Sequence, residues 1–289
     1  MFKILKKTVQ TGLVTIGYPQ TPARVSERFR GAPRFDFSAW RNVSDARAAA
    51  EACPTGAIAI RESEHSRNVT VDYGLCIYCG ECASADRSGA VQMTTQFELA
   101  AADRRNLVLT AEYTFGAEGA PSELKKLHHG YWPVEDAPAN LERAVRDRIQ
   151  EVLGRSLAIR QVDAGSCNGC EVEIAALNNP VYDLERLGIH FVASPRHADM
   201  LLVTGPVTRN MELALTKAYR ATPEPRVVVA VGACGISGGI FGRNYATLGG
   251  VDQVVPVDVF IPGCPPRPHA LLHGILLAVG RMEQKGLPQ

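Results

Sequence analysis

The stretch RVVVAVGACG, residues 226–235, places the apolar residues 227–231 directly before a glycine and the cysteine Cys234. A short valine-rich run bounded by turn residues is typical of a strand that is buried on both faces of a parallel sheet. The run at residues 257–261 has the same arrangement, because Cys264 follows it by three residues. Cofactors in open parallel sheets lie beyond the carboxyl ends of the strands, so we expect both thiols to meet there.

The sequence on either side alternates between strand and helix patterns. Apolar β-branched runs predict further strands at residues 190–193 and 200–204. Helical periodicity predicts an amphipathic helix over residues 141–153, and later helices at 171–177, 210–220 and 268–282. This alternation predicts an α/β fold, with a flavodoxin-like parallel-sheet domain over residues 138–289.

Eight cysteines fall into two groups of four. The second group is Cys167, Cys170, Cys234 and Cys264, and the first is Cys53, Cys76, Cys79 and Cys82. No export signal precedes them, which favours metal or redox chemistry over a framework of disulfides. Cys167-Asn-Gly-Cys170 begins a predicted helix, whose N–H groups stabilise an anionic thiolate cluster.

The first group contains the C-x2-C-x2-C motif Cys76-Ile-Tyr-Cys79-Gly-Glu-Cys82, which begins bacterial iron–sulfur runs. The remote fourth cysteine of such runs precedes a proline, as Cys53 does here. An internal repeat explains this spacing, because a shift of 33 residues aligns Cys53 with Asp86. The same shift aligns the motif cysteines with Val43, Ala46 and Ala49. Each half has kept only the cysteines of one shared site, so we expect one [4Fe–4S] cluster here.

Zinc is the alternative for four cysteines, because it also binds four thiolates. Zinc motifs usually contain two C-x2-C pairs, so three cysteines at two-residue gaps favour a cubane cluster. Asp86 is a candidate oxygen ligand, but the three positions that would accompany it are apolar. We therefore expect Asp86 to be a solvated surface acid.

Length and charge limit the remaining possibilities. The 289 residues predict about two domains. With 31 basic residues against 30 acidic ones, the net charge of +1 argues against a nucleic-acid partner. Residues 116–137 are rich in glycine, proline and charge, and predict a linker after an N-terminal α+β domain over residues 1–115. No run approaches the roughly 20 apolar residues of a transmembrane helix.

The N-terminal residues predict an amphipathic helix. Phe2, Leu5, Val9 and Leu13 share one helical face, and lysines lie beside it. Such a face docks onto a partner or lies on a membrane surface, or it is an ordinary packed helix. The sequence leaves these alternatives open.

The N-terminal half resembles the ferredoxin-like electron-transfer subunits of formate hydrogenlyase and respiratory complex I. Its landmarks include Lys6-Lys7-Thr8 with Thr11-Gly12, Tyr18-Pro19, Phe29-Arg30-Gly31 and the run from Cys76 to Gly80. The resemblance implies a ferredoxin-like fold for this domain. Those subunits generally carry two clusters, whereas this sequence keeps cysteines for one.

Residues 154–281 resemble the small subunit of group 4 membrane-bound [NiFe] hydrogenases and, slightly less closely, the B subunit of complex I. The motifs are DAGSCNGCEVE at 163–173, GACG at 232–235 and PVDVFIPGCPPRP at 256–268. The resemblance implies that Cys167, Cys170, Cys234 and Cys264 hold a second [4Fe–4S] cluster beside an active site on a separate large subunit. In complex I subunits the first two ligands are typically adjacent, whereas Asn168 and Gly169 intervene here, which favours the hydrogenase branch.

The resemblance therefore implies an oxidoreductase subunit with two [4Fe–4S] clusters. Its partners would be the large subunit, a ferredoxin-type carrier and integral membrane subunits, with the chain peripheral on the cytoplasmic face of the membrane. A complex I-like quinone oxidoreductase without hydrogen chemistry is the nearest alternative. A zinc-binding assembly protein without redox activity is an alternative of another class.

A few other residues have open roles. Glu173 is a candidate proton relay one turn after Cys170, or a solvated or salt-bridged acid. Three roles are open for Arg267: it hydrogen-bonds and tunes the cluster, it pairs with an acid of the large subunit, or it has a structural role in the proline-rich turn. Arg243 and Tyr245 are expected to face the large subunit. His269 and His273 have metal-binding spacing but no third ligand nearby, so packing or exposure is expected; exposure is also expected of His128 and His129.

Overall fold

Five parallel strands form the sheet of the C-terminal half in this computed structural model, which describes residues 2–19, 21–40, 43–114, 123–128, 149–151 and 154–286. The strands are β7 Leu157–Asp163, β8 Ile189–Phe191, β9 Met200–Thr204, β10 Val227–Val231 and β11 Val259–Ile261. Their order across the sheet is β8-β7-β9-β10-β11, and every ladder is parallel. This is the flavodoxin-like order, so the prediction for this half is confirmed.

The sequence pattern locates β9 and β10 to the residue, while β8 and β11 differ from the predicted ranges at their ends. It does not indicate β7. That strand begins with buried Leu157, Ala158 and Ile159, but Arg160 and Gln161 then interrupt the apolar run. Both polar residues are half-buried.

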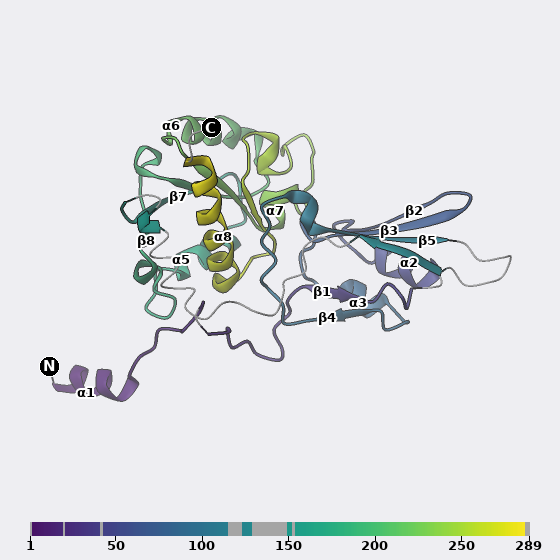
Figure 1. Cartoon of the computed structure of the whole chain (residues 1–289), viewed down its shortest axis with the longest axis horizontal. Helices are drawn as coiled ribbons and strands as arrows, with labels where there is room; N and C mark the ends of the chain where they lie inside the picture. The colour runs from purple at the N-terminus through teal and green to yellow at the C-terminus, as the bar shows by residue number, and fades with distance from the viewer. Residues whose placement is uncertain are drawn as a thin grey trace.

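Helices cover both faces of the sheet, as Figure 1 shows. They are α5 Gly169–Ala176, α6 Arg209–Ala221, α7 Gly232–Ser237 and α8 Pro268–Gly286. Val228 of β10 shares a buried cluster with Leu215 of α6, and the next residue, Val229, shares another with Ile275 of α8. Successive strand residues thus face opposite helical layers, which explains the continuous valine run.

The N-terminal half is an antiparallel α+β unit. Its elements are β1 Pro33–Phe35, α2 Val43–Glu51, β2 Ile58–Glu62, β3 Ser66–Asp72, α3 Glu81–Ala85, β4 Val91–Met93 and β5 Val108–Thr114. Strand β1 pairs with β4, and β2 pairs with β3. The 33-residue shift carries the first residue of β1 onto that of β3, and the first residue of β2 onto that of β4. The internal repeat in the sequence is therefore also a repeat of elements.

The segment predicted as a linker contains a strand. Residues Glu123–His128 form β6, which pairs antiparallel with β5 at the edge of the sheet β2-β3-β5-β6. Its residues are mostly exposed, which explains why the sequence shows no strand periodicity there. The other linker residues, and most of the helix predicted at 141–153, lie outside the described residues, although residues 149–151 are helical.

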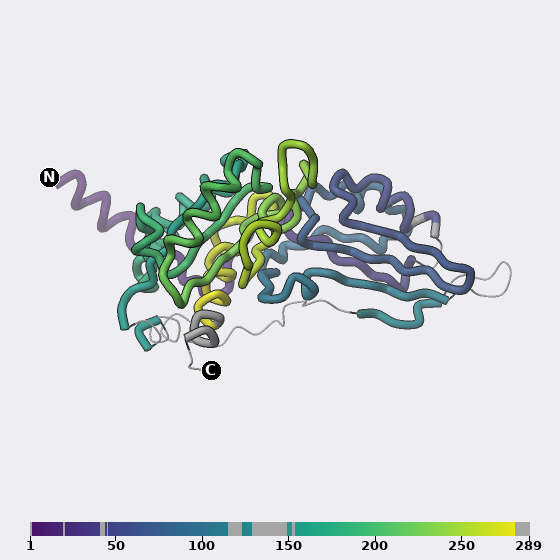
Figure 2. The backbone as a smooth tube through the Cα atoms, turned by 90° about the horizontal axis from the view of Figure 1, so that it is seen from above, coloured from purple at the N-terminus to yellow at the C-terminus, as the bar shows by residue number. Residues whose placement is uncertain are grey.

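Helix α1, Phe2–Thr11, extends away from the body of the protein in Figures 1 and 2 and has no buried residue. Its predicted apolar face is fully accessible, with Phe2 87% and Val9 76% exposed. The structure thus does not support a packed helix. No helix among the described residues is long and apolar enough to cross a membrane.

The two halves contact each other directly. Ala101 and Phe260 exchange backbone hydrogen bonds of 3.0 and 2.8 Å. The Ser237 hydroxyl donates to the carbonyl of Gly74 over 2.9 Å. One buried cluster also contains side chains of both halves, including Tyr73 and Ile236. These contacts hold the cysteine-bearing ends of the two halves against each other.

Candidate iron–sulfur sites

The four cysteines of the N-terminal half lie around one small pocket. Cys53 follows α2, and the other three lie on the loop before α3 and at the start of that helix. Two residues of this loop, Tyr78 and Gly80, have left-handed backbone conformations with φ of 57° and 86°. Backbone N–H groups point at the thiols, since Ala57 donates to Cys53 Sγ over 3.2 Å. Within the loop, the Tyr78 N–H likewise donates to Cys76 Sγ over 3.4 Å.

These thiols disfavour each other's ionisation. Burial raises the pKa of Cys76 to about 12 and that of Cys82 to about 11, and the neighbouring thiols of the set add to both shifts. Four thiolates in such a pocket need a cationic centre to hold them, because both burial and like charge oppose the anionic form. The donor set therefore fits a metal cluster.

The four cysteines of the C-terminal half lie together beyond the carboxyl ends of the parallel strands, as expected. Cys167 and Cys170 follow β7, Cys234 lies in α7 after β10, and Cys264 follows β11. Burial raises the pKa of Cys170, and the three other thiols of the set raise it further. Burial likewise raises the pKa of Cys234 to about 11.

Glycines leave the space that these thiols occupy. A Cβ atom on Gly232 would lie 2.9 Å from Cys170 Sγ, and one on Gly239 would lie 2.9 Å from Cys234 Sγ. Both glycines have positive φ, +79° and +54°. Any other residue would push a thiol out of place, so this cradle also fits a bulky cofactor. Among the described residues, no three His, Cys, Asp or Glu side chains are arranged so that they could hold a single metal ion.

The two cysteine sites border one pocket. Ile77 and Tyr78 of the first cysteine loop line it together with Cys264, Pro265 and Pro266 of the second. The two cysteine loops therefore lie beside each other.

Glu173 and Arg267 lie near the second site. Burial raises the pKa of Glu173, and the charge of Arg267 opposes that shift. The Arg267 guanidinium lies over two rings, 4.7 Å from the centroid of Phe29 and 5.1 Å from that of Phe97. Arg267 is thus held by cation–π contacts with the N-terminal half.

Glu171 is an acid that the sequence reasoning missed. Its carboxylate accepts a hydrogen bond from the hydroxyl of Thr204 at the end of β9, and its Oε2 atom is buried without a hydrogen-bond partner. It also raises the pKa of Cys170. Its position directly after Cys170 was the available signal.

Several side chains that follow Cys170 and Cys234 in the chain are exposed. Val172 is 61%, Ile240 58% and Tyr245 92% exposed, and Phe241 and Arg243 are exposed as well. Ile240 and Phe241 directly follow Gly239, which contacts Cys234. An apolar surface beside a cysteine site indicates a covering partner.

Aromatic rings pack around His269. His269 is buried edge-on between Tyr18 and Tyr182, with ring centroids 5.1 and 5.2 Å away. Burial lowers the pKa of His269 to about 4 and also lowers that of His273. Packing is therefore confirmed for His269, and His128 is exposed as expected, while His129 lies outside the described residues.

Asp86 is a half-buried acid whose carboxylate is hydrogen-bonded as well as solvated. Its side chain accepts hydrogen bonds from Trp40 Nε1 over 3.2 Å, from the Ser88 hydroxyl and from the Val91 backbone. Trp40 is fully buried, in the same cluster as Ala46 and Ala49. Two of the positions that the repeat aligns with the cysteines, Ala46 and Ala49, thus belong to the same packed core as the Trp40 indole.

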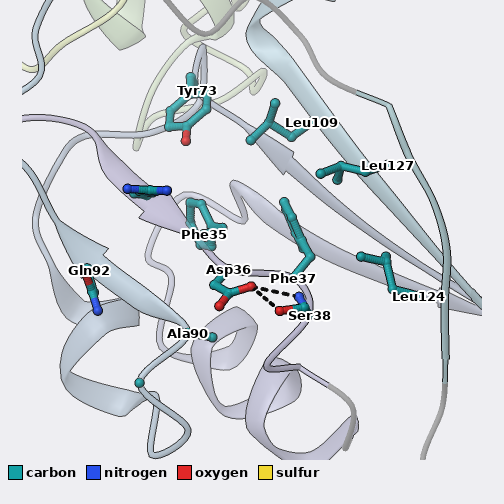
Figure 3. A pocket seen from close by; sticks show the side chains of 12 residues that line it. Phe35, Asp36, Phe37, Ser38, Tyr73, Ala90, Gln92, Leu109, Leu124 and Leu127 are labelled. Atoms are coloured by element: carbon teal, nitrogen blue, oxygen red, sulfur yellow. Dashed lines mark hydrogen bonds between the residues drawn. The ribbon is translucent and has the colours of Figure 1, made fainter.

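A larger pocket lies between β1 and the sheet of β5 and β6 (Figure 3). Phe35, Phe37, Tyr73 and leucines line it, and Asp36 accepts hydrogen bonds from Ser38 at its rim. Phe35 also lines the first cysteine pocket, so one ring separates the two.

Comparisons with known proteins cover the C-terminal half. Residues 167–278 match the family model of the NADH ubiquinone oxidoreductase 20 kDa subunit. Formate hydrogenlyase subunit 7 of Escherichia coli is 48% identical over 53% of this chain, which spans 58% of that relative's length. "Probable membrane-bound hydrogenase subunit mbhJ" of Pyrococcus furiosus is 50% identical over 47% of this chain and 81% of its own. The B subunit of NADH-quinone oxidoreductase from Citrifermentans bemidjiense is 50% identical over 37% of this chain and 62% of its own.

Proposed function

The chain belongs to the NADH ubiquinone oxidoreductase 20 kDa subunit family, and membership of this family of oxidoreductase subunits implies that it binds iron–sulfur clusters. From this premise we propose a specific role for the chain. It is the electron-transfer subunit of a membrane-associated group 4 [NiFe] hydrogenase complex of the formate hydrogenlyase type. The observation that carries this proposal is the shared pocket, which the two cysteine loops border from opposite sides. A relay needs two redox sites that are close together and fixed relative to each other.

Each cysteine set would hold one [4Fe–4S] cluster, which accepts and releases single electrons when bound. Cys53, Cys76, Cys79 and Cys82 hold the first, in a ferredoxin-like domain over residues 1–115. Cys167, Cys170, Cys234 and Cys264 hold the second, in the domain over residues 138–289. The chain itself fixes the separation of the sites, excludes water from the buried thiols and sets the surrounding charge.

The partners follow from the surfaces. The exposed apolar side chains beside the second site, including Val172 and Tyr245, support a large subunit that carries the active site there. Glu173, partly buried beside this surface, would pass protons toward that subunit. A ferredoxin-type carrier would exchange electrons with the first cluster. The helix α1, with its apolar face and lysines, supports peripheral attachment to membrane subunits on the cytoplasmic face.

Hydrogen-driven reduction tests this role. The chain is produced anaerobically with the large subunit from the same source, and the complex is purified and analysed for nickel. Hydrogen gas alone should bleach the visible absorption of both clusters, and a Cys170→Ser complex should lose that response. A nickel-free complex whose clusters respond to quinol but not to hydrogen would contradict the proposal.

The second candidate is a complex I-like quinone oxidoreductase subunit without hydrogen chemistry. The chain is 50% identical to the B subunit of an NADH-quinone oxidoreductase and also 50% identical to the hydrogenase subunit mbhJ, so this candidate has the same support from sequence identity as the first. The spacing Cys167-Asn-Gly-Cys170 favours the hydrogenase branch instead. The nickel analysis distinguishes the two.

A further inference from the structure

Two arginines lie in the pocket between the cysteine sites. Arg30 lies against the first cysteine loop, where its Nη1 donates to the carbonyl of Cys79 over 2.5 Å. Arg267 lies three residues after Cys264 and lines the same pocket as Arg30. One guanidinium thus adjoins each cysteine loop, on the side that faces the other loop.

The surrounding structure holds the Arg267 side chain and the backbone that carries the exposed Arg30. Gly31 and Ala32, directly after Arg30, donate backbone hydrogen bonds to Thr94 and Gln96 over 2.8 and 2.7 Å. A Cβ atom on Gly31 would lie 2.2 Å from the Gln96 carbonyl oxygen, so only glycine permits this contact. The two chain segments therefore stay together, and they hold the Phe29 and Phe97 rings under the Arg267 guanidinium.

Neither arginine forms a salt bridge with a described residue, although Glu173 is near enough for the charge of Arg267 to lower its pKa. Within the described ranges, no carboxylate lies within salt-bridge distance of the Arg30 or Arg267 guanidinium. Four thiolates give an iron–sulfur cluster a negative charge, and reduction by one electron makes it more negative. A neighbouring cation therefore stabilises the reduced form more than the oxidised form.

We propose that Arg30 and Arg267 support electron transfer between the two cysteine sites through their charge. Each guanidinium stabilises the reduced state of the cluster beside it and so raises the reduction potential of that cluster. The step moves one electron: one [4Fe–4S] cluster is oxidised, the other is reduced, and no proton is transferred. This inference rests on the proposed function. A wild-type chain without clusters would refute that function, whereas the variants below test only the arginines.

The experiment is a redox titration, followed by electron paramagnetic resonance, of the complex purified anaerobically with its large subunit. Arg30→Gln keeps an N–H donor for the Cys79 carbonyl, and Arg267→Met keeps an apolar stem on the two rings. Each should lower the reduction equilibrium constant of its own cluster about tenfold, a shift of about 59 mV for one electron, and that of the other cluster less. Arg30→Lys and Arg267→Lys should restore most of each shift.

Arg28→Gln is the matched control, because Arg28 is an exposed arginine of the same segment that does not line the pocket. Unchanged potentials in either neutral variant, or equal shifts in the control, would overturn the proposal. The proposal would also be overturned if the lysine variants showed the same potential shifts, or the same loss of iron, as the neutral variants. In that case the shape of the arginine side chain, and not its charge, would matter. Cluster loss in a neutral variant that lysine rescues supports the charge requirement.

Discussion

Gly232→Ala is the most direct test of the glycine cradle at the second site. The added Cβ would lie 2.9 Å from Cys170 Sγ, whereas ordinary contacts between such atoms begin at about 3.5 Å. Cys170 would therefore have to move by about 0.6 Å, which exceeds the roughly 0.5 Å tolerance of a preorganised site. We expect the C-terminal cluster to be lost, and iron to fall from about eight to about four atoms per chain.

The backbone cost of the substitution has to be separated from this contact. Gly232 has φ of +79°, and an L-residue there costs about 1–2 kcal/mol. Gly188 has nearly the same φ, +74°, but a Cβ there would meet nothing within 4 Å. Gly188→Ala should therefore lower the thermal unfolding midpoint by about 2–4 °C without loss of iron, whereas Gly232→Ala should lower it further because it also loses the cluster.

Iron and sulfide analysis with electron paramagnetic resonance measures the outcome in both variants. The N-terminal cluster signal should survive in each. If Gly232→Ala keeps about eight iron atoms, or if Gly188→Ala loses as many as Gly232→Ala does, the cradle does not act on Cys170 as argued.

Four further outcomes are expected. The chain prepared anaerobically should contain about eight iron and eight sulfide, and stoichiometric zinc would contradict the iron assignment. Cys53→Ala should leave at best a fragile three-iron cluster in the N-terminal half while the C-terminal signal survives; two unchanged signals would disprove the crossover ligation. Replacing the four aligned positions with cysteine should add a third cluster only when Trp40→Ala is included, because the indole fills that core, and iron analysis of both combinations checks this. Leu5→Glu with Val9→Glu should leave the unfolding midpoint unchanged, since neither side chain is buried, and a drop of several degrees would show that α1 packs against the body.

The parts of this structure that follow from local pattern were predictable. A strand such as β10 is apolar at every position because helices cover both faces, and that pattern is visible in the sequence. Strands β7 and β6 were missed for related reasons. Polar Arg160 and Gln161 interrupt the first, and exposed residues make up nearly all of the second.

Contacts between distant segments were not predictable in this way. Motif spacing groups the cysteines, but no spacing indicates that Arg30 bonds to the loop of Cys79 or that Arg267 lies on Phe29. Asp86 shows the same limit. The repeat identifies it as a former ligand position, while its actual role depends on Trp40, which lies 46 residues earlier in the chain.

The position of the N-terminal cysteines within the internal repeat is consistent with an electron relay. The 33-residue repeat has two potential sites, and the retained one includes the loop of Ile77 and Tyr78, which borders the pocket shared with Cys264. At the lost site, Ala46, Ala49 and Asp86 do not line that pocket. Without the site at Cys53, Cys76, Cys79 and Cys82, the proposed C-terminal cluster would have no neighbouring cluster in this chain. Without the other position of the repeat, both proposed clusters remain. The buried core around Trp40 fills the other position of the repeat, so under the proposed function electrons would leave the N-terminal half from a cluster beside Cys53.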